Sequence, residues 1–271
     1  MKKTFLALGI IGMLHHSCKD TDVLNPNDLK STQASQDHLI AESIFNDIGH
    51  VVKEALHNEG ESKSYPNYTL INSNSSDIDT LIIDFGNTNC LHNGKLRKGI
   101  INVTFTGKYS DYLSVITTTF DNYYVNNSLV QGERILTNQG EIDTISGRIR
   151  FKIDIKNASI MTPNGLINWQ SNVIQEWVSG QDTYSDITDD RYIISGSGSG
   201  NNANGNPFQF TIIDTLNLDF NCLPYCKIKS GTTKISPDNY TDRIINYGDS
   251  ICDCNVNVLI DEHTHLIVVD Y

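Results

Sequence analysis

The stretch GRIRFKIDIK, residues 147–156, determines how the rest of the chain is interpreted. Its apolar residues Ile149, Phe151, Ile153 and Ile155 alternate with arginine, lysine and aspartate. Successive side chains of a β-strand point to opposite faces, so this alternation predicts a strand with one apolar and one charged face. Strands of this kind are typical of an antiparallel sheet that has one dry and one wet face.

Further strands with this alternation are expected along the chain. They are expected at residues 81–86, 99–107, 113–125, 129–138, 167–177, 208–220 and, as a hairpin, 256–269. The segments VNNS (125–128), TPNG (162–165) and NNANGN (201–206) contain residues that tight turns favour. The pattern predicts a mainly β fold, with a curved antiparallel meander sheet of about ten strands that is either an open barrel or sandwich-like.

One segment before the strands has the spacing of an amphipathic helix. In DHLIAESIFNDIGHVVKEALHNEG (37–60), apolar residues recur at intervals of three and four, at Ile40, Ile44, Ile48, Val51, Val52 and Ala55. Asp37 is expected to cap the start of this helix, and Gly60 follows its end. We expect one N-terminal helix, residues 36–58, with one face packed on the sheet. No spacer divides the strands, so residues 36–271 are expected to form a single domain.

The N-terminus has the order of a bacterial lipoprotein signal. The basic residues Lys2 and Lys3 precede an apolar run, TFLALGIIGML (4–14), which is too short to span a bilayer. The small residue Ser17 then stands directly before Cys18, as in a lipobox, where the cysteine is diacylated and the precursor is cut before it.

We therefore expect residues 1–17 to be a signal peptide and residues 18–35 to contain the lipid attachment site and a flexible tether. The position three before Cys18 is His15, where the lipobox usually has leucine, so ordinary secretion is the alternative. No later segment has an apolar run long enough to span a membrane.

The charge of the chain is strongly acidic. It has 20 lysines and arginines against 32 aspartates and glutamates, and removal of Lys2 and Lys3 with the signal peptide leaves a net charge of −14. Such a surface repels the phosphate backbone, so we expect no nucleic-acid partner. It also repels anionic lipid head groups, so membrane attachment is expected to come from the lipid on Cys18.

Parts of the chain resemble a family of uncharacterised lipoproteins of the Bacteroidetes. The resemblance is carried by residues 84–140, 195–212 and 243–253 and covers most of the chain from Asp84 onward. Its most specific parts are FDNY (120–123) and YGD (247–249). It implies a compartment, a lipid-anchored position in the outer membrane, but it implies no activity and no catalytic residues.

Two further properties follow from the resemblance. Asp20 and Asp22, just after Cys18, are similar to signals that send lipoproteins of that phylum to the cell surface. Members of the phylum also attach O-glycans at aspartate, then serine or threonine, then an apolar residue. Thr80 and Thr144 fit this motif at strand edges or in loops, whereas Thr215 fits it deep in a strand whose dry face is expected to hold Asp214. We therefore expect glycans on Thr80 and Thr144.

Five cysteines follow Cys18: Cys90, Cys222, Cys226, Cys252 and Cys254. In an oxidising envelope some of them should pair. Cys252 and Cys254 lie two apart on a strand and face the same side, so they cannot easily bond to each other. We expect disulfides between the pair Cys222 and Cys226 and the pair Cys252 and Cys254, with Cys90 free. The alternative is a four-thiolate zinc site, although its ligands are usually separated by two residues.

Other polar residues have weaker patterns. His50, Glu54 and His57 share one side of the expected helix and are interpreted as a solvated face rather than a metal site. The acidic stretch QDTYSDITDD (181–190) is interpreted as a solvated loop rather than a calcium site, because it lacks the EF-hand spacing. His263 and His265 are interpreted as residues of a hairpin turn.

No catalytic group can be assembled from the sequence. Cys90 and His92 lie close together, but no third residue orients them. SGSGSG (195–200) lies in a strand, where it cannot form the strand-to-helix elbow of a serine hydrolase, and its glycines are expected to thin the sheet or allow bulges.

The sequence favours a non-catalytic envelope lipoprotein that serves as a binding or structural module, without a cofactor or a metal. Its expected partner, besides the membrane, is an envelope protein or an apolar ligand. The alternative is a carrier that holds an apolar or lipid ligand in the concave face of the sheet, in a groove lined by Trp169, Trp177 and Phe210. An enzyme of unknown type is the third hypothesis, because no nucleophile, base and orienting group can be named together.

Overall fold

The computed structural model describes residues 31–57, 66–71, 78–142, 146–183, 186–222 and 226–269. The expected lipid site Cys18 and the expected glycan site Thr144 lie outside the described residues.

The described chain consists of one long helix followed by a meander of strands. The elements are α2 (Gln33–His57), β1 (Asn67–Ile71), β2 (Asp79–Asp84), β3 (Cys90–His92), β4 (Lys95–Phe105), β5 (Val115–Val125), β6 (Ser128–Glu141), β7 (Ile149–Thr162), β8 (Gly165–Ser179), η1 (Ile187–Asp189), β9 (Arg191–Asn201), β10 (Pro207–Asp219), η2 (Phe220–Cys222), β11 (Ile228–Pro237), β12 (Arg243–Asp249), β13 (Asn255–Ile260) and β14 (His263–Val268). The mainly β fold with one N-terminal helix is confirmed.

All strands belong to one antiparallel sheet of fourteen strands, more than the ten or so that the sequence predicts. Each strand pairs with its neighbours in sequence, except that the short β3 pairs only with β4. Within the described residues β1 and β14 have one neighbour each, so the sheet stays open. It is therefore one curled sheet rather than two layers of a sandwich.

The turns between long strands follow the sequence prediction. Asn126 and Asn127, between β5 and β6, both have positive φ, of 46° and 65°. A two-residue hairpin turn of this kind needs positive φ at both positions, and asparagine tolerates it. The register of β10 shifts on both sides of Asp214, and this carboxylate is exposed. The expectation that Asp214 faces the dry side is therefore wrong, because the irregular pairing breaks the alternation.

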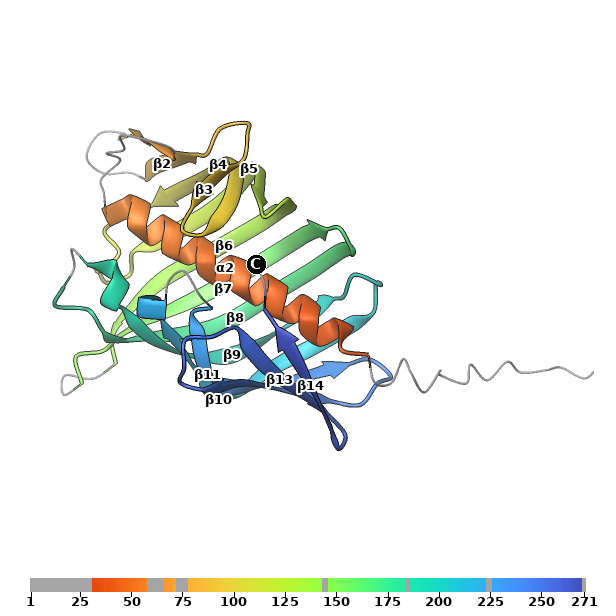
Figure 1. Ribbon diagram of the computed structural model, residues 1–271. Coiled ribbons are helices and arrows are strands. Elements are labelled where there is room, and N and C mark those ends of the chain that lie inside the picture. Colours follow the sequence, from red (N-terminus) through yellow and green to blue (C-terminus); the bar gives the residue numbers. More distant parts are fainter. Residues whose placement is uncertain are drawn as a thin grey trace, which may run out of the picture.

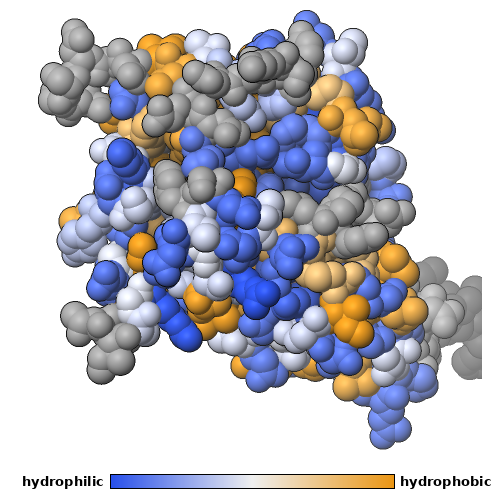
Figure 2. All heavy atoms as spheres, turned by 60° about the vertical axis from the view of Figure 1, so that its left-hand side comes forward, coloured by the Kyte–Doolittle hydropathy of each residue, from blue (hydrophilic) through white to orange (hydrophobic). Residues whose placement is uncertain are grey.

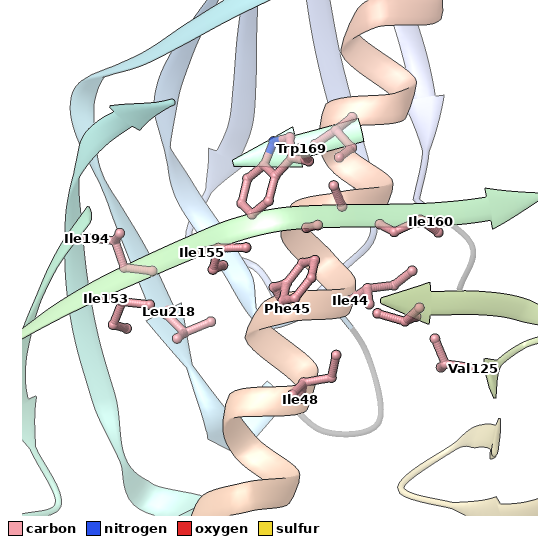
Figure 3. Close-up of a cluster of buried hydrophobic side chains, with 14 of the residues drawn as sticks. Ile44, Phe45, Ile48, Val125, Ile153, Ile155, Ile160, Trp169, Ile194 and Leu218 are labelled. Atoms are coloured by element: carbon pink, nitrogen blue, oxygen red, sulfur yellow. The ribbon is translucent and has the colours of Figure 1, made fainter. Parts of the chain in front are cut away.

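The sheet curls around α2. Figure 1 shows the helix running diagonally across the sheet, with the long central strands behind it and the C-terminal strands beside its N-terminal half. Phe45 of the helix stacks on Trp169 with ring centroids 5.7 Å apart, and Trp169 stacks on Phe210 at 5.5 Å. Figure 3 shows Phe45, Ile44 and Ile48 pointing into the apolar side chains of the sheet. The expected packing of the helix on the sheet is confirmed.

The helix is buried on more than one face, which the sequence does not predict. Its buried polar residues are Ser35, Asp37, His38, Glu42, Asp47, His50 and Lys53. The curled sheet reaches around α2, so side chains opposite the apolar stripe are also covered. Among the described residues, no helix is both long and apolar enough to cross a membrane.

The expectation that Asp37 caps the helix is wrong. The helix begins at Gln33, and the carboxylate of Asp37 lies within its second turn. Asp37 Oδ2 accepts a hydrogen bond from the backbone N–H of Ala203 at 2.7 Å. The carboxylate therefore ties the helix to the β9–β10 turn.

The glycines of SGSGSG make room for aromatic rings in the core. A Cβ atom on Gly198 would lie 2.4 Å from Cε1 of Phe210, and a Cβ on Gly200 would lie 2.8 Å from Cζ of Phe208. Both distances are far shorter than a van der Waals contact, so only glycine fits under these rings. The glycines thin the sheet at this point, as expected.

Candidate functional site

A pocket of about 370 Å³ lies beside α2, between the β3–β4 turn and the C-terminal strands. Its apolar walls are Leu39, Leu218, Ile228, Tyr247, Val256 and Val269. Its polar residues include Glu42, Ser43, Asn46, Asn93, Lys95, Lys227 and Asp253. This size is within the range of small-molecule sites, which are mostly apolar with a few placed polar groups.

The outer surface has a different character. Figure 2 shows one face of the molecule, on which hydrophilic side chains surround separate hydrophobic patches. Small scattered patches of this kind are normal for a folded protein. The pocket beside α2, which combines apolar walls with buried charges, is therefore the stronger candidate for a binding site.

A tight turn places Lys95 in the pocket. Asn93 and Gly94 both have positive φ, of 49° and 76°, and join β3 to β4 as a two-residue turn. Asn93 Nδ2 donates a hydrogen bond to Glu54 Oε2 at 2.8 Å, which fixes the turn to the C-terminal half of α2. Lys95 follows directly, as the first residue of β4.

A disulfide bond holds Lys227 at the opposite wall. Cys226 is bonded to Cys254, and its neighbour Lys227 accepts, through its backbone carbonyl, a hydrogen bond from the N–H of Asp219 at 2.8 Å. The side chain of Lys227 then reaches α2, where Nζ donates to Oδ1 of Asp47 at 2.9 Å. Side chains from three distant parts of the chain therefore meet beside the helix.

Asp47 is the centre of a buried group of cations. Its side chain is 2% exposed, and Oδ2 lies 2.7 Å from Nη1 of Arg97. Burial acts to raise the pKa of Asp47, but the charges of Lys227, Arg97 and Lys95 outweigh it and hold this pKa well below its usual range. Asp47 is therefore ionised at neutral pH and faces three cations.

The cations also act on one another. Burial, together with the charges of Lys227 and Arg97, lowers the pKa of Lys95 to about 8, although Asp47 opposes this shift. Burial and the charge of Lys227 lower the pKa of His50 to about 3, so this imidazole is neutral at pH 7. Asp47 is thus shared by two cations at hydrogen-bonding distance, Arg97 and Lys227.

The other end of the pocket contains a carboxyl group that is half ionised near neutral pH. The hydroxyl of Tyr247 donates to Oε2 of Glu42 at 2.7 Å, and burial raises the pKa of Glu42 to about 7. His38 Nε2 lies 3.7 Å from Glu42 Oε1, but burial lowers the pKa of His38 to about 3, so the ring is uncharged. Trp169 Nε1 donates to His38 Nδ1 at 3.4 Å, which suits the neutral ring.

Replacing Glu42 by glutamine should change how stability depends on pH. An unfolded glutamate titrates near 4.5, whereas the folded group titrates near 7. Between these values the folded state keeps a proton that the unfolded state has lost, so the free energy of unfolding of the wild type falls as pH rises. Glutamine keeps a hydrogen-bond acceptor for Tyr247 but does not titrate, so its side chain causes no fall in the free energy of unfolding as pH rises.

We compare the free energy of unfolding of Glu42→Gln with that of the wild type at each pH. The variant minus the wild type should be about 2–3 kcal/mol larger at pH 8 than at pH 4.5. Urea unfolding at the two pH values measures this difference. The exposed residue Glu262 provides the control, and Glu262→Gln should show no such pH dependence. A pH-independent effect of Glu42→Gln would show that Glu42 ionises as freely as in the unfolded chain.

The four C-terminal cysteines form two disulfides, Cys222–Cys252 and Cys226–Cys254, with Cα–Cα distances of 5.2 and 5.1 Å. Pairing between the two clusters is thus confirmed, and the zinc alternative is wrong because the sulfurs are bonded to each other. Cys90 is free and partly buried, and burial raises the pKa of its thiol. It is therefore not an activated thiolate at neutral pH.

The acidic stretch 181–190 is only partly a solvated loop. Asp186 is exposed and caps η1, but Asp190 is buried and forms an ion pair with Lys53 of α2. Trp177 Nε1 donates to Asp190 Oδ1 at 2.9 Å, and the ammonium of Lys53 lies 3.8 Å from the centre of the Trp177 ring. Asp190 lies in the interior because its carboxylate is the counter-charge of Lys53, which α2 buries there. In the described part of the chain, no cluster of three acidic, histidine or cysteine side chains could hold a metal ion.

The interpretation of His50, Glu54 and His57 as a solvated face is wrong for His50. His50 is buried and packs edge-on against Phe220 of η2, with ring centroids 4.6 Å apart. Glu54 and His57 are partly exposed. His263 is exposed at the start of β14, and His265 is partly buried.

The groove expected in the concave face is closed. Trp169, Trp177 and Phe210 are all buried under α2, each with at most 5% of its surface exposed.

The expected glycan site Thr80 is partly exposed in β2, opposite Thr104 of β4. Thr215 is exposed in β10.

The sequence analysis missed Asp47, Lys95 and Lys227, and it did not single out Glu42. A charged residue between apolar neighbours in the helix, as at Asp47 before Ile48, was the available signal, but it also fits a helix with one wet face. Comparisons with known proteins add no further information: no family model, no curated protein and no solved structure matches this chain.

Proposed function

We propose that this protein is a lipid-anchored protein of the bacterial cell envelope and works as a non-catalytic binding module. The observation that carries the binding role is the pocket beside α2, with apolar walls and a few placed charged residues, among them Glu42, Lys95 and Lys227. The lipoprotein-like order of residues 1–18 and the resemblance to Bacteroidetes lipoproteins support the anchor, through Cys18, in the outer membrane and at the cell surface.

The filled concave face favours this role over that of a carrier. A carrier of the kind expected from the sequence needs an open groove at Trp169, Trp177 and Phe210, and α2 occupies that space. The charged groups of the pocket are held in pairs, Asp47 with Arg97 and Glu42 with Tyr247. A few placed polar groups among apolar walls are the usual arrangement of a ligand-binding pocket.

A bulky residue in the pocket should abolish ligand binding. Ser43 lines the pocket and is partly exposed, so the tryptophan in Ser43→Trp would occupy the space of a ligand. We expect native mass spectrometry of the wild type, purified from its own host, to show a bound small molecule that Ser43→Trp lacks. Asn46→Trp, on the same wall, is a second variant in case the first folds poorly.

The matched control is Ser110→Trp, which places the same ring on an exposed loop and should keep the ligand. The same spectra give the mass of the mature N-terminus, which should begin at an acylated Cys18. An unmodified start elsewhere would contradict the anchor. A ligand that remains bound in both pocket variants would contradict the binding role of the pocket.

A further inference from the structure

A cationic side chain lies in the core between α2 and the sheet. Arg134 of β6 is 6% exposed, and it packs against the helix, where a Cβ atom on Gly49 would lie 2.8 Å from its Nη2. Glycine inside a helix costs about 1 kcal/mol relative to alanine. The helix therefore has a destabilising residue at a position where the guanidinium needs the room.

The guanidinium of Arg134 has no acceptor of its own. Within the residues that the structure describes, no hydrogen bond and no ion pair joins it to another group. Burial lowers the pKa of Arg134, and the groups that oppose this shift are the phenols of Tyr109 and Tyr192 rather than a carboxylate. Arginine has five N–H donors, and buried donors without a partner are costly. An acceptor beside Arg134 would remove this cost.

A small cavity borders this guanidinium. Its volume is about 20 Å³, which is room for about one water molecule or one ion of similar size. Its apolar walls include Phe45, Ile153, Ile155 and Ile194, which Figure 3 shows between the helix and the sheet. These four side chains are buried, so the cavity lies in the core.

Two more polar side chains line this cavity, Ser171 and Gln175 of β8. Both are buried, and among the described residues the Oγ atom of Ser171 has no hydrogen-bond partner. A hydroxyl and a side-chain amide can each donate a hydrogen bond, as the guanidinium does. Three donors from two strands therefore line a space that can hold one small acceptor.

One carboxylate lines the same cavity, that of Glu42, but it forms no ion pair with Arg134. Glu42 Oε2 accepts from the hydroxyl of Tyr247 at 2.7 Å, and Oε1 lies 3.7 Å from Nε2 of His38. In either protonation state Glu42 therefore leaves the N–H groups of Arg134 without an acceptor.

We propose that this cavity binds a monatomic anion, chloride or another halide, with Arg134, Ser171 and Gln175 as its hydrogen-bond donors. This site goes beyond the proposed function and does not depend on it. The anion accepts from all three groups and places a negative charge beside the buried guanidinium, which a water molecule cannot do. Because Arg134 lies against Gly49, the bound ion also helps to hold α2 on the sheet.

The first test is a crystal structure with bromide. The full chain with Cys18→Ala, which needs no detergent, is unfolded in urea and refolded in sodium bromide, so that the ion can enter the core. We expect an anomalous bromine peak in the cavity, within hydrogen-bonding distance of the Arg134 guanidinium. A cavity that contains only water, or no ordered density, would overturn the proposal.

Urea unfolding tests the same site in solution. At constant ionic strength, with gluconate replacing chloride, a tenfold rise in chloride above its dissociation constant should raise the ratio of folded to unfolded protein about tenfold. Arg134→Met should lose this dependence, because methionine cannot donate a hydrogen bond. Arg150→Met is the matched control and should retain it, because the side chain of Arg150 is 39% exposed and pairs with Glu176.

Ser171→Ala is a second variant in case Arg134→Met does not fold. It keeps the guanidinium but loses one donor, so it should need about tenfold more chloride for the same stabilisation. The anion site is overturned if the wild type is equally stable in chloride and gluconate, or if Arg134→Met responds to chloride as the wild type does. Neither result would affect the binding role of the pocket beside α2.

Discussion

Replacing Ile44 by aspartate should lower the free energy of unfolding by about 4 kcal/mol. Ile44 is 3% exposed and lies in the apolar layer between α2 and the sheet (Figure 3). The substitution would bury a carboxylate that has no counter-charge among the surrounding isoleucine and aromatic side chains. Urea unfolding followed by tryptophan fluorescence measures the change, because Trp169 and Trp177 both lie under the helix.

The neighbouring residue provides the control for this prediction. Ser43 is partly exposed, so Ser43→Asp places the same charge one position away in a wetter environment. It should change the free energy of unfolding by less than about 1 kcal/mol. If Ile44→Asp were as stable as Ser43→Asp, α2 would not be part of the core.

Replacing Asp47 by alanine should cost about 3–5 kcal/mol of stability, because it leaves buried cations without their counter-charge. Arg97 is fully buried, and the side chain of Lys227 is only 9% exposed. Asp47→Asn should cost less, since the amide oxygen can still accept one hydrogen bond. Chemical unfolding at pH 7 and low salt measures both variants.

A surface ion pair is the comparison for Asp47→Ala. Arg150 Nη2 and Glu176 Oε1 lie 3.0 Å apart, with side chains 39% and 21% exposed. Because water screens this pair, Glu176→Ala should cost less than about 1 kcal/mol. Similar losses from Asp47→Ala and Glu176→Ala would mean that the cations near Asp47 are solvated in the folded protein.

Most of the fold could be predicted because strand alternation is a local property. The alternating residues from Ile149 to Ile155 lie within β7, and the turns after β5, β7 and β9 lie where asparagine, glycine and proline indicate them. The pairing of the two cysteine clusters was also predicted, but its premise was wrong, because Cys252 and Cys254 lie in the loop before β13 and not on a strand. The strands β11 and β12 were not predicted. In β11 the inward residue Thr233 is polar yet buried, which weakens the alternation.

The candidate site could not be predicted, because its residues meet only through the curl of the sheet. Lys227 and Asp47 are 180 residues apart in the chain. Lysine before a strand and aspartate within a helix are usually exposed, and no local pattern distinguishes these two. The interpretation of His50 was wrong for the same reason: a helix considered alone has a wet face, whereas α2 is enclosed on several sides.

The position of a bound ligand tests the central claim most directly. A crystal structure of the protein purified from its own host, with the molecule that it retains, would locate this ligand by electron density. We expect the density in the pocket lined by Leu39, Lys95 and Val256. Density among Trp169, Trp177 and Phe210, or only on the outer surface, would contradict the assignment of the pocket beside α2 as the binding site.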